Sequence, residues 1–404
     1  MLLLKKSRGC VIIIAINGFA GVLMKVQLVA TCMFGLERFL GEEIDALGCR
    51  RLETIDGRVT FEGDAADAAR ANVNLRCAER VLLKVGSFEA RTFTELFDAT
   101  KALPWEDYIG KNDAFPVRGH SVKSTLFSVS DCQSIMKKAV VDRLSSKYGI
   151  KWFEETGITY QIEFFIIRDL VTVMIDLSGM GLHKRGYRPA AGAAPLRETL
   201  AAALVLNSRP RENVLLWDPF CGSGTIPVEA SMIMTHRAPG MNRAFAGEAY
   251  AFLPSGIWDA AREEARDAVD DSSAFEAYGS DVDLRVLDFA RENAKRAGVE
   301  SRIRFFEADA RKIKKPADRR GTIICNPPYG ERMMSAAEVE SLYREVGKCF
   351  AALSPWQIYI LSSYPSFERL YGAKADKVRK LYNGMIPCNL YQYFKNPAKA
   401  EKKY

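Results

Sequence analysis

The sequence predicts an α/β protein in which two small α+β modules precede a larger domain built on a mostly parallel, doubly wound sheet. A length of 404 residues is enough for two or three domains that each bury a core. From residue 196 onward, short apolar runs alternate with helical patterns, which is typical of a parallel sheet with helices on both faces. Residues 25–177 instead contain strands and helices in shorter α+β units.

The composition favours a folded protein with a mild preference for polyanionic partners. Hydrophobic residues make up 48% and charged residues 26%, and 57 Lys+Arg against 50 Asp+Glu give a formal charge of +7. The nine cysteines include no C-x-x-C pair, and with three histidines the chain has no zinc-ligand spacing. We therefore expect no metal site, and the dispersed cysteines fit the reducing cytoplasm.

The N-terminus has one feature of a signal peptide, because basic residues precede an apolar run over residues 10–24. The run is interrupted by Asn17 and Gly18, has no clear small-x-small cleavage site, and is short for a membrane span of about 20 residues. We expect residues 1–24 to be an extension, or the product of a start assigned too early with Met24 as the natural beginning. No membrane association is expected, and residues 397–404 form a basic tail.

The first module, residues 25–90, has the order of elements of a ferredoxin-like domain. Its predicted elements are a strand at 26–31, a helix at 35–47, two short strands around the turn at Asp56 and Gly57, a helix at 64–73 and a strand at 80–87.

The second module, residues 91–180, has a helix at 94–102, a strand near 114–122, a basic helix at 130–148 and paired strands at 160–168 and 170–177. Residues 178–195, rich in Gly, Pro and basic residues, have no clear period and resemble a linker or surface loop, with 181–195 as the linker proper.

The third domain, residues 196–396, contains the alternating elements. They are a helix at 197–207, a strand at 214–217, a helix at 225–234, an insert at 236–273, a strand at 274–280, a helix at 284–297, strands at 303–307 and 321–325, a helix at 335–353 and a strand at 357–361.

The motif Asp218-Pro-Phe-Cys-Gly-Ser-Gly-Thr225 lies between a strand and a helix and predicts a nucleotide-type site. Gly222 and Gly224 allow close approach of a ligand to the backbone, and the following helix offers free N–H groups. The motif is neither a phosphate loop nor G-x-G-x-x-G, which disfavours ATP and dinucleotides. The alternative is a tight connection without a ligand.

A second motif, Asn326-Pro-Pro-Tyr329, follows the apolar strand at 321–325, at the carboxyl end where sites of α/β sheets lie. The prolines fix the backbone. The Asn326 side-chain oxygen and the Pro327 carbonyl are placed to accept both N–H groups of a nucleobase amine, and Tyr329 to stack on the base. The alternative is a rigid loop with a buried tyrosine.

Two acids follow the intervening strands. Asp281 is suited to accept both hydroxyls of a ribose, and Asp309 to accept an adenine amino group. Each has an alternative interpretation as a helix N-cap.

In this order, the four motifs resemble class I S-adenosylmethionine-dependent methyltransferases that modify exocyclic amines. More narrowly, Leu182-His-Lys-Arg-Gly-Tyr-Arg188, Ala194-Pro-Leu-Arg-Glu-Thr199, Ala238-Pro-Gly-Met-Asn-Arg243 and Asn326-Pro-Pro-Tyr-Gly-Glu-Arg332 resemble the THUMP-domain RNA guanine-N2 methyltransferases, in particular the bacterial enzymes that act on large-subunit rRNA. The resemblance covers about residues 25–396. It implies a Rossmann-like methyltransferase domain preceded by ferredoxin-like and THUMP modules, and it makes the insert a family feature.

The resemblance also implies site residues. The cofactor S-adenosylmethionine is assigned to Asp218, Phe220, Gly222, Gly224, Thr225, Asp281, Asp309 and Asn326. Catalysis is assigned to Asn326, Pro327, Pro328 and Tyr329.

RNA contacts are predicted for two basic stretches, with Tyr187 as a stacking ring. Their members are Lys137, Lys138, Arg143, Lys147, His183, Lys184, Arg185 and Arg188. The alternative for such stretches is a solvated face.

The predicted function is transfer of a methyl group from S-adenosylmethionine to the N2 amine of a guanine in structured RNA, with rRNA favoured over tRNA. The base is expected to be flipped into the pocket formed by Asn326 to Tyr329. Three alternatives remain open: a tRNA guanine-N2 methyltransferase, a DNA adenine-N6 methyltransferase, and an RNA-binding assembly factor without catalytic activity. The sequence does not indicate which oligomeric state the protein adopts.

Overall fold

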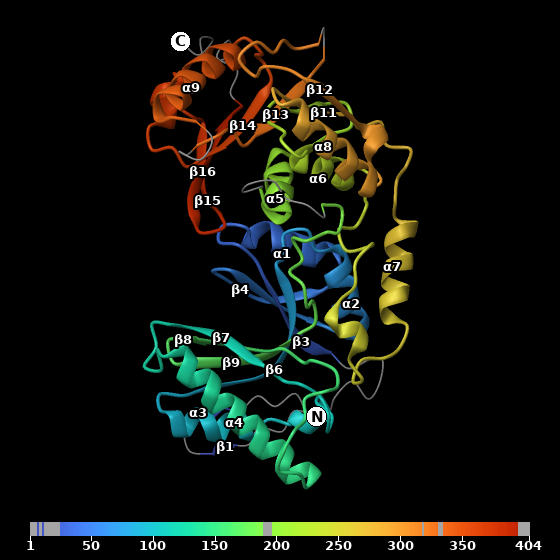
Figure 1. Ribbon diagram of the computed structural model, residues 1–404, viewed down its shortest axis with the longest axis vertical. Helices are drawn as coiled ribbons and strands as arrows, with labels where there is room; N and C mark the ends of the chain where they lie inside the picture. Colours follow the sequence, from blue (N-terminus) through green and yellow to red (C-terminus); the bar gives the residue numbers. More distant parts are fainter. Residues whose placement is uncertain are drawn as a thin grey trace.

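The computed structural model describes residues 6–7 and 10–11 as backbone, and residues 25–188, 196–316, 319–329 and 334–394. The molecule is elongated and contains two seven-stranded sheets, one in each half of the chain (Figure 1). The predicted α/β class is confirmed. Of the N-terminal extension, only the short paired strands β1 (Lys6–Ser7) and β2 (Cys10–Val11) lie within the described residues. The tail at 397–404 and residues 189–195 lie outside them.

The first two predicted modules share one sheet. Its strands are β3 (Val26–Thr31), β4 (Arg50–Ile55), β5 (Arg58–Gly63), β6 (Arg80–Glu89), β7 (Val117–Val122), β8 (Ile162–Ile167) and β9 (Leu170–Asp176), in the order β4-β5-β3-β6-β9-β8-β7. The ten-residue β6 pairs with β3 on one side and with β9 on the other. It therefore joins the ferredoxin-like order of elements to the second module through backbone hydrogen bonds on both of its edges, with a register shift between Lys84 and Gly86 on the β9 side.

One face of this N-terminal sheet is covered by helices. They are α1 (Glu37–Ala46), α2 (Ala65–Asn74), α3 (Phe93–Lys101), the 3₁₀ turn η1 (Trp105–Asp107) and α4 (Val129–Tyr148). Residues that alternate along the strands point to opposite faces. Accordingly Leu28 and Leu83 join the main core, while Val29 and Leu82 form a small separate cluster on the other face.

The C-terminal sheet has five parallel strands and a terminal hairpin. Its strands are β10 (Leu215–Asp218), β11 (Ala277–Asp281), β12 (Ile303–Glu307), β13 (Gly321–Cys325), β14 (Gln357–Ser362), β15 (Lys377–Asn383) and β16 (Ile386–Tyr393), in the order β12-β11-β10-β13-β14-β16-β15. β16 runs antiparallel to both neighbours. The strand order reverses at β10 and β13, and ligand sites of open α/β sheets lie at such a switch point.

Helices accompany this sheet as the alternating pattern predicts. They are α5 (Glu198–Ser208), α6 (Thr225–Met234), α7 (Ile257–Asp267), α8 (Leu284–Arg296), α9 (Ala336–Ala351) and α10 (Phe367–Tyr371), with 3₁₀ turns η2 (Ala246–Ala249) and η3 (Glu300–Arg302). Neither α7 nor the β15–β16 hairpin is among the elements predicted from the sequence. In α7, Trp258, Ala261 and Ala265 form a buried stripe at helical spacing, and the helix packs against α2 of the N-terminal half (Figure 1).

The expected surface loop after β9 is wrong for its described part, residues 178–188. Leu182, Arg185 and Tyr187 are buried, and the Val81 backbone N–H donates to Ser178 Oγ over 2.8 Å. This segment packs between the N-terminal sheet and α6. Two of its basic residues, Arg185 and Arg188, are therefore placed inside an interface between the two halves of the chain.

Candidate functional site

The loop after β10 is held against the end of β11. The backbone N–H of Cys221 donates to the Ser280 carbonyl over 3.0 Å, and that of Gly222 donates to Oδ2 of Asp281 over 3.0 Å. The loop begins at Asp218, whose Oδ1 accepts from the Phe220 N–H over 3.0 Å. These bonds bring two of the motifs predicted from sequence together at the carboxyl edge of the sheet.

The two glycines of this loop have different roles. Both have positive φ, +50° at Gly222 and +80° at Gly224, a region that L side chains rarely adopt. A Cβ at Gly224 would lie 3.0 Å from the Phe305 ring and from the Ala290 methyl group, so this position needs glycine for packing. No atom lies within 4 Å of a Cβ built at Gly222, which leaves open space on that side of the loop.

Asp218 is buried, and burial raises the pKa of its carboxyl well above the ordinary value. Its described contact is with the loop backbone, so it shapes the turn in which half-buried Phe220 lies. Thr225, the first residue of α6, is also buried, and its hydroxyl accepts a hydrogen bond from Arg188 over 2.9 Å. A cofactor role for these residues remains a prediction.

The N-cap alternative is wrong for both acids. The cap of α8 is Asp283, whose side chain accepts from the Arg285 N–H, whereas Asp281 Oδ1 accepts from the Asp283 N–H over 3.1 Å. Asp309 begins a turn rather than a helix and forms a bidentate ion pair with Arg311, which lowers the pKa of the Asp309 carboxyl. Asp281 ends β11 next to the β10 loop, whereas Asp309 follows β12 on the far side of β11, where the Ala308 N–H donates to the Asp281 carbonyl over 3.1 Å.

Asn326 follows β13 with its side-chain oxygen buried. Oδ1 of Asn326 has no hydrogen-bond donor within reach among the described residues. A buried acceptor without a partner costs about 1–3 kcal/mol, which an incoming hydrogen-bond donor would recover. The sequence motif predicted this oxygen as an acceptor for an incoming amine.

Two residues that the sequence analysis did not identify hold the Asn326–Tyr329 loop in place. The Tyr343 hydroxyl of α9 donates to the Pro328 carbonyl over 2.8 Å. Asn383, at the end of β15, donates from Nδ2 to the Tyr329 hydroxyl over 2.9 Å. Burial raises the pKa of the Tyr329 phenol, so the hydroxyl stays protonated at neutral pH. No local pattern links either residue to the motif, because both contacts arise from the sheet order.

Replacing Asp281 with alanine is expected to weaken binding of S-adenosylmethionine by about 10- to 100-fold, since it removes a charged acceptor and the anchor of the Gly222 N–H. Titration calorimetry measures the affinity. Asp283→Ala is the control, because it removes the cap of the same helix and is expected to cost about 1 kcal/mol of stability with little change in cofactor affinity. Equal affinities for Asp281→Ala and the wild type would show that Asp281 anchors the Gly222 turn and does not bind the cofactor.

The predicted RNA contacts on α4 are mostly ion-paired. Lys137 pairs with Glu155 and lies 3.7 Å from the centre of the Phe115 ring, while Arg143 and Lys147 both pair with Glu106. Lys138 is exposed. The positive charge available to a phosphate on this helix is therefore smaller than the sequence indicates.

The structure corrects the second basic stretch. Arg185 is buried and pairs with Glu229, and the Arg188 side chain is 8% exposed and pairs with Glu198, so neither reaches RNA in this conformation. Tyr187 is also buried and donates its hydroxyl to Glu229 over 3.0 Å, which excludes a stacking role. His183 pairs with Glu79, and Lys184 is exposed. Lys184 and Lys138 remain predicted RNA contacts.

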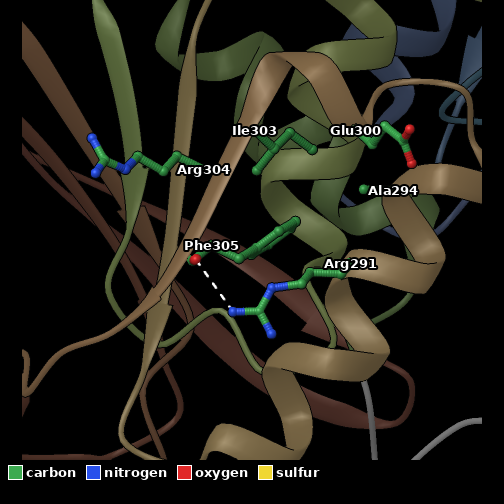
Figure 2. A pocket seen from close by; sticks show the side chains of 6 residues that line it. All are labelled: Arg291, Ala294, Glu300, Ile303, Arg304 and Phe305. Carbon is green, nitrogen blue, oxygen red and sulfur yellow. Dashed lines mark hydrogen bonds between the residues drawn. The ribbon is translucent and has the colours of Figure 1, made fainter.

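A concavity of about 410 Å³ lies outside the motif loops. It is lined by Arg291, Ala294, Glu300, Ile303, Arg304 and Phe305, from α8, η3 and the edge strand β12 (Figure 2). Arg291 donates to the Phe305 carbonyl over 3.4 Å. None of the predicted site residues lines this concavity, although the Phe305 ring extends from it to Gly224.

Two general properties follow from the described residues. None of the helices in the described ranges is long and apolar enough to span a membrane. Within the same ranges, no group of three His, Cys, Asp or Glu side chains is arranged to hold a metal ion.

Three family models match consecutive parts of the chain. Residues 27–82 match the RlmL ferredoxin-like domain, residues 90–176 match the THUMP domain, and residues 185–392, about half of the chain, match the model described as RMKL-like, methyltransferase domain.

Full-length relatives agree with these matches. The Bacillus subtilis protein named "Putative RNA methyltransferase YpsC" is 43% identical over 381 residues, which cover 94% of this chain and 98% of that protein. The crystal structure of a predicted N6-adenine-specific DNA methylase from Listeria monocytogenes is 46% identical with a TM-score of 0.86, covering 93% of this chain and 97% of that one. SMU.472, crystallised in complex with SAH, is 38% identical with a TM-score of 0.85, covering 92% and 98%. This chain therefore belongs to the RMKL-like methyltransferase family, with RlmL-type ferredoxin-like and THUMP domains ahead of its methyltransferase domain.

Proposed function

We propose that this methyltransferase transfers the methyl group of S-adenosylmethionine to the exocyclic N2 amine of a guanine in structured RNA. We propose large-subunit rRNA as the RNA that it modifies. The observation that carries the proposal is the buried, unpartnered Oδ1 of Asn326 at the carboxyl end of β13. An amine entering this site would supply the donor that the oxygen lacks.

The residues present fit S-adenosylmethionine. The open side of Gly222 admits a ligand against the loop backbone, and the carboxylates of Asp281 and Asp309 lie at the ends of the next two strands, where ribose hydroxyls and an adenine amine need acceptors. A relative 38% identical was crystallised with SAH, the demethylated form of this cofactor. When bound, the cofactor supplies a methyl group on a positively charged sulfur.

The chain's own residues then act on the target amine. The lone pair of a nucleobase amine is delocalised into the ring, which makes the nitrogen a poor nucleophile. Two acceptors, Asn326 Oδ1 and the Pro327 carbonyl, would draw the two N–H groups out of the ring plane and localise the lone pair on nitrogen. Pro327 and Pro328 keep the loop rigid, and Tyr343 fixes it through the Pro328 carbonyl.

An RNA substrate is supported by the THUMP match at residues 90–176 and by the name of YpsC. A DNA adenine-N6 activity is the competing candidate, because the relative from Listeria carries that description. Both substrates present an exocyclic amine, so Asn326 alone does not choose between them. The THUMP domain favours RNA.

The test is methylation of unmodified large-subunit rRNA, tRNA and duplex DNA with labelled S-adenosylmethionine, followed by digestion to nucleosides and mass spectrometry. We expect N2-methylguanosine from rRNA. N2-methylguanosine from tRNA alone would move the target to tRNA, and N6-methyladenosine from duplex DNA would replace the proposal with the competing activity. Absence of product from all three would favour an assembly factor without catalysis.

A further inference from the structure

The turn between β15 and β16 projects beyond the sheet on the side of the Asn326 loop. β16 pairs with β14 only as far as Asn389, opposite Ser362, whereas its pairing with β15 continues to Ile386, opposite Asn383. Residues 386–388 therefore extend past the carboxyl end of β14. Because β13 and β14 are parallel neighbours, Asn326 follows β13 at this same edge.

The hairpin is bonded directly to the proposed target pocket. Asn383, the last residue of β15, donates to the Tyr329 hydroxyl over 2.9 Å, and Sγ of Cys388 in β16 lies 3.9 Å from the same oxygen. The turn and the tyrosine predicted to stack on the base consequently hold a fixed position relative to each other.

The tip of this hairpin is apolar and exposed. Met385 is 94% exposed and Ile386 is 48% exposed, and Pro387 is exposed as well. The two central residues of the turn are Gly384 and Met385, and of these only Gly384 has a positive φ, which is the pattern of a type II′ turn. A tight turn of this kind holds Met385 in a defined place at the outermost point of the hairpin.

The N-terminal domain supports the hairpin from one side. The Phe34 ring, 55% exposed, packs edge-on against Tyr382 with ring centroids 6.0 Å apart, and Arg379 lies over Phe39. A Cβ at Gly35 would lie 2.9 Å from the Lys380 carbonyl, so the two chain segments are in close contact. Figure 1 shows the hairpin extending toward α1. These contacts with the N-terminal domain hold the hairpin, and with it the exposed tip, in place.

An exposed cation lies on the strand behind the apolar tip. Lys380 on β15 is exposed, and its Nζ is 5.6 Å from the centre of the Tyr382 ring, whereas Lys377 begins β15 at the far end of the hairpin, opposite Gln392. An apolar tip with a cation on the strand behind it matches a nucleic-acid strand, in which phosphates surround stacked bases. Proteins that unstack bases insert Met, Ile, Leu, Phe or Pro side chains into the base step.

We propose that Met385 is the wedge that enters the RNA stack beside the target guanine, so that the guanine leaves the helix and reaches Asn326 and Tyr329. This inference rests on the proposed function and deepens it. The enzyme must extrude its target to act on it, and extrusion leaves a gap in the stack that an apolar side chain fills. Met385 is a positioning residue, since it acts on the neighbouring bases and not on the reacting amine.

The test uses the full chain and unmodified large-subunit rRNA transcribed in vitro. In single-turnover methylation, Met385→Ala is expected to react about 10- to 100-fold more slowly than the wild type. Its affinity for S-adenosylmethionine and its melting temperature should stay unchanged, and Met385→Leu should restore most of the rate. The control is Val378→Ala, which truncates an exposed apolar side chain of the same hairpin away from its turn and should react normally.

A second measurement reports on the RNA itself. In complexes formed with S-adenosylhomocysteine, dimethyl sulfate should modify N3 of the cytosine left unpaired by the extruded guanine, and Met385→Ala should lose this reactivity. A wild-type rate and an unchanged reactivity for Met385→Ala would overturn the wedge, as would equal losses for Met385→Ala and Val378→Ala. Failure of the proposed function looks different, because then the wild-type enzyme itself makes no N2-methylguanosine.

Discussion

Replacing Asn326 with alanine is expected to lower the rate of methyl transfer by about 10²- to 10³-fold, the usual cost of removing one polar group that stabilises a transition state. Affinity for S-adenosylmethionine should remain within about twofold of the wild type, because in the proposed site the buried oxygen of Asn326 faces the target amine and not the cofactor, to which the family resemblance also assigned this residue. The rate constant comes from single-turnover assays on saturating RNA, and the affinity from titration calorimetry.

The stability of this variant also carries information. Alanine removes both an acceptor, Oδ1, that has no partner among the described residues and a side-chain hydrogen bond to Tyr329, so the unfolding free energy of Asn326→Ala should stay close to that of the wild type. A matched control is Asn74→Ala at the end of α2, whose side-chain amide donates to the Arg70 carbonyl in the N-terminal domain and should leave methyl transfer unchanged. A near-normal rate on a guanine substrate for Asn326→Ala would contradict the proposed role of the carboxamide.

The sequence was sufficient to predict the elements around the site, because each motif directly follows a strand. Short strand patterns such as residues 321–325 and the turn residues after them are local signals, and the structure places the ends of these strands side by side. Tyr343 and Asn383 were not predicted, since they reach the Asn326–Tyr329 loop only through the order of strands and the packing of α9. A contact set by topology leaves no spacing to detect in a single sequence.

The sequence also does not predict that the first two modules share one sheet. Two successive α+β modules are compatible with two separate sheets or with one shared sheet. The pairing between β6 and β9 that joins them links residues about 90 positions apart, and such a long-range pairing leaves no local signal in the sequence. By contrast, α7 carried a readable signal in the spacing of Trp258, Ala261 and Ala265.

The charge pattern of the sequence does not predict which basic residues are exposed, and Arg185 is an example. A basic cluster predicts a nucleic-acid surface only if its side chains are exposed, and exposure depends on which acids the fold brings near. Glu229 lies on α6, 44 residues after Arg185, and both side chains are almost completely buried at 3.5 Å from each other. The arginine also donates to the carbonyls of Leu182 and Arg76. It therefore connects the N-terminal domain to α6, the helix that follows the β10 loop.

The Arg185→Met variant is accordingly expected to lose about 3–5 kcal/mol of unfolding free energy, the cost of leaving one member of a buried ion pair without its partner. Glu229 would keep the hydrogen bond from Tyr187 and the electrostatic attraction of buried Arg76, but would lose its direct ion-pair partner. Urea denaturation followed by tryptophan fluorescence measures the loss. Arg38→Met is the surface control, because Arg38 and Glu42 are both more than half exposed and such pairs contribute about 0–1 kcal/mol.

The double variant Arg185→Met/Glu229→Met separates the ion pair from simple packing. Removing both charges eliminates the uncompensated carboxylate, so the double variant should be more stable than Arg185→Met alone, with a coupling energy of about 1–3 kcal/mol. Additive losses would show that the two side chains act independently and that the carbonyl contacts of Arg185 hold the interface. A loss below about 1 kcal/mol for Arg185→Met would mean that the buried arginine does not stabilise the junction between the halves of the chain.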